Sequence, residues 1–155
     1  MRFPTLHPRD LEGLEYELPA GLPGAYRVIL LPFKQWHQIL VGQWQEAIAP
    51  ALAGRDDVSV WEVPALSGLW KAARPYIDGG MRSGIPDIDV RRHTLTSYGE
   101  LGTITESLDI TGFETIHVFL LDAEGEILWR DSGEPDAEKA AGFAAALAAA
   151  TAPPA

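Results

Sequence analysis

A strand–helix–strand pattern in the first half of the chain constrains the fold more than any other feature. The run Tyr-Arg-Val-Ile-Leu-Leu at residues 26–31 is short, apolar and rich in β-formers, which predicts a strand buried on both faces. Apolar residues then recur at helical spacing over 36–52, and an alternating run follows at 58–63. Two strands joined by a helix form a βαβ unit, whose strands are parallel and whose crossover is right-handed.

The flanking segments extend this unit to an α/β domain with a central mixed sheet of about five strands flanked by helices. Residues 10–19 alternate apolar and acidic side chains, which predicts an edge strand. Runs at 115–122 and 126–130 predict a hairpin that turns at Gly125, where glycine permits a positive φ. The alanine-rich segment 132–150 predicts a final helix, with Ser132 as its cap.

The chain is expected to form one domain over residues 1–155, because its length suits a single core. Residues 10–150 are predicted to be ordered and 151–155 to be a frayed tail. Residues 65–96 carry little periodicity and predict an irregular insertion, of the kind that often carries function. A helix is expected over about 97–108.

Composition excludes several functions. The net charge of −10 would repel nucleic acid and anionic membrane surfaces, so no nucleic-acid partner is predicted. The chain has no cysteine, which excludes disulfides, thiolate metal sites and a cysteine nucleophile. Its four histidines lack ligand spacing, and no phosphate-binding or dinucleotide glycine motif occurs, so neither a metal nor a cofactor is predicted.

The sequence also predicts a cytoplasmic location. The first ten residues lack the apolar core of a signal peptide, and the apolar run 144–150 is too short to span a bilayer, so no membrane insertion is expected. The preference for Arg over Lys, with abundant Ala, suggests a bacterium with a GC-rich genome.

The order of elements resembles the thioredoxin-like fold, with the extra N-terminal strand of its peroxiredoxin and thiol-reductase branch. In that fold the redox Cys-x-x-Cys lies between the first central strand and its helix, where the helix N-terminus activates a thiolate. Two alignments of this loop are open: His37 and Leu40 replace the cysteines in one, and Gly42 and Gln45 in the other. The cis-proline that contacts substrate beside the redox pair is replaced by Glu114.

Short motifs occur in order at 63–64, 69–70, 81–82, 108–110, 118–122, 125–130, 132–133 and 136–138. Over about residues 26–150 the chain thereby resembles the ATPase complex subunit 10 family, whose members are mitochondrial ATP synthase assembly factors. That resemblance implies a non-catalytic protein that binds a membrane subunit of the ATP synthase. The chain lacks a mitochondrial presequence, so a cysteine-free bacterial relative is the inference.

Candidate contact residues come from two places. Trp36, His37 and Gln38 lie at the former redox loop, and Glu114 is expected at the same edge of the sheet. Trp36, and Trp70 within the insertion, lie in or next to irregular segments, so one or both are predicted to form an exposed aromatic contact of the kind that interfaces favour. Arg74 and Arg82 offer guanidinium groups that suit a carboxylate or phosphate on a partner.

Three functions stay open at this point. A non-catalytic binding or assembly module would use these residues to contact a protein partner, which could be a membrane-protein subunit. An enzyme of unnamed reaction would use His37 with Glu114 as acid and base. In a structural role, an exposed edge would pair with another copy, and the oligomeric state is not predicted.

Overall fold

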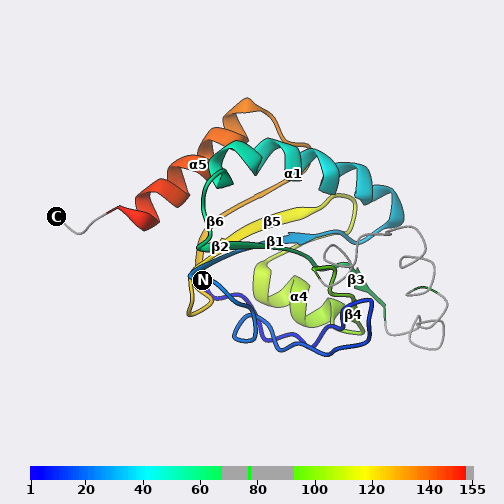
Figure 1. Cartoon of the computed structure of the whole chain (residues 1–155). Coiled ribbons are helices and arrows are strands. Elements are labelled where there is room, and N and C mark those ends of the chain that lie inside the picture. Colours follow the sequence, from blue (N-terminus) through cyan, green and yellow to red (C-terminus); the bar gives the residue numbers. More distant parts are fainter. Residues whose placement is uncertain (68–76, 78–92, 153–155) are drawn as a thin grey trace.

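The computed structural model describes residues 1–67, 77 and 93–152. Figure 1 shows a central sheet with helices α1 and α5 on one face, and with helix α4 and the N-terminal segment on the other. Trp70, Arg74 and Arg82, and most of the predicted insertion 65–96, lie outside the described residues.

The main sheet contains the predicted βαβ unit. Its strands are β1 (Tyr26–Leu31), β2 (Val58–Glu62), β5 (His117–Leu121) and β6 (Ile127–Ser132), in the order β2-β1-β5-β6. Strands β1 and β2 are parallel, as expected for two strands joined by a crossover helix. Strand β5 pairs antiparallel with both β1 and β6. The predicted hairpin is confirmed, with Gly125 in its turn at φ +86°.

Helices α1 (Gln38–Leu52) and α5 (Ala137–Thr151) cover one face of this sheet. Trp44 and Phe143 from the two helices are fully buried, and the half-buried Trp129 of β6 packs between them at ring distances of 5.9 and 5.4 Å. Helix α5 begins later than the sequence predicts. Its cap is Asp136, whose side chain accepts a hydrogen bond from the Lys139 N–H at 2.8 Å, rather than Ser132.

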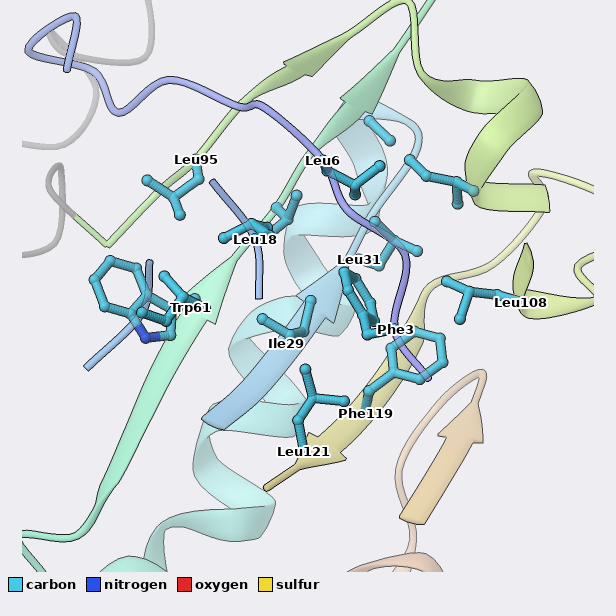
Figure 2. Close-up of a cluster of buried hydrophobic side chains, with 14 of the residues drawn as sticks. Phe3, Leu6, Leu18, Ile29, Leu31, Trp61, Leu95, Leu108, Phe119 and Leu121 are labelled. Atoms are coloured by element: carbon cyan, nitrogen blue, oxygen red, sulfur yellow. The ribbon is translucent and has the colours of Figure 1, made fainter. Parts of the chain in front are cut away.

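The predicted edge strand at residues 10–19 is wrong, so the main sheet has four strands rather than five. The N-terminal segment lies against the second face of the sheet instead, and it makes only isolated bridges, such as Leu6 with Leu18. Figure 2 shows Phe3, Leu6 and Leu18 packed among the side chains of that face. Helix α4 (Leu101–Leu108) covers only part of this face, so burying the N-terminal leucines completes the core there.

A short parallel pair lies beyond the carboxyl end of β2. It joins β3 (Ala65–Leu66) to β4 (Ser97–Tyr98), so the predicted insertion 65–96 begins with a strand and is followed directly by another. The helix predicted over 97–108 therefore begins only at Leu101. Gly99 has φ +79°, which separates the strand from the helix. No helix within the described parts of the chain is long and apolar enough to cross a membrane.

Candidate functional site

The site begins at the loop that follows β1. Pro32 ends the strand, and a short 3-10 helix, η1 (Gln35–His37), leads directly into α1. This is the place where the sequence resemblance puts the redox loop. The structure brings four predicted residues to this region: Trp36, His37, Gln38 and Glu114.

His37 is fully buried and organises the loop. Its Nδ1 accepts hydrogen bonds from the backbone N–H groups of Phe33 and Lys34, at 3.0 and 3.1 Å. An imidazole nitrogen that accepts hydrogen bonds carries no proton, so the proton of the neutral ring lies on Nε2. That buried Nε2–H makes no hydrogen bond to the described residues.

The electrostatic surroundings keep His37 neutral. Burial is the main effect and lowers its pKa, and the Lys34 charge acts in the same direction. The Glu114 backbone carbonyl raises the pKa and has the second-largest effect, ahead of the Lys34 charge, whereas the Glu114 carboxylate raises it least. Protonation at Nδ1 would also remove the acceptor of two backbone N–H groups. Geometry and electrostatics therefore agree on a structural, uncharged imidazole.

Lys34 and Glu114 tie this loop to the segment that precedes β5. Lys34 Nζ donates to Glu114 Oε1 at 2.9 Å, and this contact is the main reason that the pKa of Glu114 is lowered. Beside the pair, the rings of Phe33 and Phe113 lie 5.0 Å apart. Because Lys34 binds the Glu114 carboxylate and His37 Nδ1 binds the backbone, the structure does not assemble His37 and Glu114 as a hydrogen-bonded acid–base pair.

Two large apolar side chains project from the same place. Trp36 is 52% exposed and Ile39 is 66% exposed. The Trp36 ring lies 4.4 Å from the His37 ring in an edge-on arrangement, so the buried imidazole supports the indole. Sequence periodicity placed Ile39 on the stripe that faces the sheet. It points away because the helix phase is set by Leu40, Val41 and Trp44, which are the buried residues of this part of α1.

Sequence reasoning missed Glu62 at the carboxyl end of β2. Its side chain is buried, accepts a hydrogen bond from Gln38 Nε2, and lies 3.4 Å from the Thr94 hydroxyl. Burial raises the pKa of Glu62, and the bonds from Gln38 and Thr94 oppose that effect. The sequence held one hint of this role. Every second residue of a strand shares one face, and Glu62 alternates with apolar residues in the strand predicted over 58–63. Gln38 is thereby occupied in holding α1 to β2.

Comparisons with known proteins decide the fold. No protein-family model and no curated protein matches the chain. Among solved structures, copper-bound ScoI from Arabidopsis thaliana superposes with a TM-score of 0.65 at 11% identity, covering 95% of this chain and 98% of that one. The exposed lipoprotein thioredoxin Etrx1 from Streptococcus pneumoniae gives 0.59 at 14%, covering 92% and 98%. A thiol:disulfide interchange protein from Bacteroides gives 0.62 at 16%, covering 92% and 85%.

The chain has a thioredoxin-like fold. At these identities the likeness shows the fold alone, and the resemblance to the ATPase complex subunit 10 family stays a prediction. A thioredoxin-like chain without cysteine has no thiol chemistry at the η1 loop. The described residues also hold no group of three or more His, Asp or Glu that could bind a metal ion.

Proposed function

We propose that this thioredoxin-like protein is a non-catalytic binding module that contacts a protein partner through the loop before α1. The contact residues are Trp36 and Ile39, with the Lys34–Glu114 ion pair beside them; we call these four residues the η1 surface. The observation that carries the proposal is the exposure of Trp36 and Ile39 where the fold would otherwise hold its redox cysteines.

The chemistry of the η1 surface suits a protein interface. Aromatic residues are enriched at energetic centres of interfaces, where charged residues lie at the rim. The indole of Trp36 is held by the buried His37 ring and so loses little freedom on binding. Lys34 and Glu114 already satisfy each other, which leaves a neutral rim at pH 7. An apolar segment of a partner could therefore cover Trp36 and Ile39 without leaving Lys34 or Glu114 buried and unpaired.

The ATPase complex subunit 10 resemblance supplies a candidate partner, a membrane subunit of the ATP synthase. This assignment rests on the sequence segments quoted for that family. We further propose that Trp70, Arg74 and Arg82 extend the η1 surface, with the arginines binding carboxylates or phosphates of the partner. A cytoplasmic location would place the protein where it meets such a subunit during assembly.

The test is affinity capture from detergent-solubilised cells of the source organism, with quantitative mass spectrometry. The variant is Trp36→Ala with Ile39→Ala, and the control is Leu14→Ala with Leu128→Ala, which removes two exposed apolar side chains elsewhere. Loss of a central aromatic contact costs about 2 kcal/mol or more, so enrichment of an ATP synthase membrane subunit should fall about 30-fold or more in the variant only.

Two results would argue against this function. Equal capture of the subunit by the variant and the control would remove the η1 surface from the interaction. Absence of any ATP synthase subunit from the wild-type capture would remove the proposed partner. Circular dichroism of both double variants should match the wild type, because all four side chains are exposed.

A further inference from the structure

The outer edge of β2 has backbone N–H and C=O groups that face away from the sheet. The Tyr26 N–H donates to the Asp57 carbonyl at 3.0 Å, and the Val63 N–H donates to the Leu30 carbonyl at 2.7 Å. These bonds show that odd-numbered positions of this segment face β1. Backbone groups alternate along a strand, so those of Val58 and Val60 face outward. Neither residue makes a backbone hydrogen bond on that side within the described residues.

The same edge already pairs with an extended segment at its carboxyl end. The Glu62 N–H donates to the His93 carbonyl at 2.9 Å, and the Leu95 N–H donates to the Glu62 carbonyl at 2.7 Å. The edge is therefore straight and open enough to accept a strand. That pairing begins at Glu62, and no other described segment pairs with the outer edge at Val58 and Val60.

An apolar groove lies beside the uncovered part of the edge. Its volume is about 320 Å³, which is enough for a few aliphatic side chains. Val60 lines the groove and, with Val58, packs toward the face of the sheet that α1 covers. Groove and free edge are therefore on adjoining sides of one strand. The groove is lined by Gln45, Ile48, Ala49, Leu52, Ala53 and Val60.

Charge around the groove selects the kind of strand that would bind. Glu46 on α1 and Asp56 before β2 are exposed and make no ion pair within the described residues, whereas Asp57 is neutralised by Arg55 at 2.7 Å. A second copy of this chain would bring the same acidic residues and a further charge of −10 to the edge. Like charges oppose such pairing, whereas a cationic segment is attracted.

We propose that the β2 edge and its groove bind an extended, basic segment of another protein by strand addition. The backbone of that segment would pair with the outward N–H and C=O groups of Val58 and Val60. Alternate apolar side chains would enter the groove, and Lys or Arg would lie against Glu46 and Asp56. Backbone pairing supplies affinity in this mode of recognition, and the alternate side chains supply specificity. This surface is separate from the η1 surface and does not depend on its function.

The probe is the synthetic peptide acetyl-Lys-Lys-Val-Thr-Val-Thr-Val-Thr-amide, added to the full-length ¹⁵N-labelled protein. Two further peptides carry Glu in place of Lys, or N-methyl groups on the valine amides. The variant Ala49→Arg places a long, positively charged side chain at an exposed helical position that lines the groove, where it opposes a basic peptide. Ala145→Arg makes the same change at an exposed position of α5, and it serves as the control.

Binding is measured by amide chemical shifts and hydrogen exchange. In the free protein the Val58 and Val60 amides should exchange faster than the Ser59 amide, which faces β1. Saturation with the basic peptide should slow both by about tenfold or more, because their N–H groups gain acceptors. Acidic peptide, methylated peptide and Ala49→Arg should each weaken binding by about tenfold or more, and Ala145→Arg by less than about twofold.

Three results would overturn the proposal. Equal binding of the acidic peptide would refute the charge argument, and unchanged binding by Ala49→Arg would refute the groove. Slow exchange of Val58 and Val60 in the free protein that is lost on dilution would instead identify a second copy of the chain as the occupant.

Discussion

Replacing His37 with alanine tests whether this residue organises the loop that carries the η1 surface. The substitution removes the only acceptor seen for the Phe33 and Lys34 N–H groups within the described residues. A buried N–H left without a partner costs about 1–3 kcal/mol, and the Phe33 group is buried whereas the Lys34 group is partly accessible to water. Adding lost packing of the ring against Phe33 and Trp36, we expect a destabilisation of about 3 kcal/mol.

Urea denaturation at about pH 7.5 measures the loss in the free energy of unfolding. In thermal denaturation, the same loss should lower the melting temperature by about 6–12 °C for a chain of this size. His37→Asn should recover about half of the stability, because its side-chain oxygen replaces the Nδ1 acceptor. His7→Ala is the matched control. The His7 side chain is 56% exposed, so its removal should cost less than about 0.5 kcal/mol.

The pH dependence gives an independent check on His37. Its pKa is lowered in the folded state, so below the ordinary value of 6.5 the unfolded chain binds the proton first. Wild-type stability should therefore decrease as the pH falls below 6.5, and the gap between wild type and His37→Ala should narrow. A loss under about 1 kcal/mol at neutral pH, or a gap that widens on acidification, would refute the structural role assigned to this histidine.

Three further substitutions test other parts of the structure. Burial, with a smaller effect of Arg130, lowers the pKa of His117 to about 4. The free energy of unfolding should therefore fall by about 3 kcal/mol between pH 6.5 and 4, because the unfolded chain binds the proton first. In urea titrations at these pH values, His117→Phe should remove this contribution to the pH dependence. Gly125→Ala would bring a Cβ to 2.5 Å from the Pro19 side chain at a φ of +86°, which should cost about 2 kcal/mol in the same assay; a neutral result would show that the hairpin turn relaxes. Burial raises the pKa of Glu62, so ionisation of this side chain opposes folding once the pH exceeds the ordinary pKa of a glutamate. As the pH rises to about 8, Glu62→Gln should therefore gain stability relative to the wild type. Thermal melts that show the opposite trend would contradict this prediction.

Local pattern was sufficient for the elements whose partners are close in the chain. The βαβ unit and the hairpin at Gly125 were predicted because their residues show periodicity over a full element and end at Pro or Gly. The segment 10–19 has equally clear alternation, yet it forms no strand. An alternating pattern specifies two faces of a strand but not the strand with which it pairs. Here Leu18 packs in the core on the second face of the sheet, and the segment forms only isolated bridges.

The binding role of the candidate residues stays a prediction, and the structure shows only which of them lie together. The sequence identified Trp36, His37 and Glu114 as neighbours, because the fold brings the loop after β1 close to the segment before β5. An exposed Trp36 was among the predictions, whereas the burial of His37 was not. Which residue is buried in a loop depends on the rings packed over it, and Phe33 and Phe113 come from segments 80 residues apart in the chain.

Periodicity and residue identity are enough to predict the α/β class, the parallel crossover and the absence of thiol chemistry. The folded arrangement was needed to show that His37 is a buried acceptor and that Ile39 joins Trp36 at the surface. It was also needed to show that the outer edge of β2 has no partner among the described residues at Val58 and Val60, beside a groove. Burial and pairing are properties of distant segments meeting in space. Local sequence patterns do not specify which distant segments pack together, so the surfaces proposed for binding can be identified only in the folded molecule.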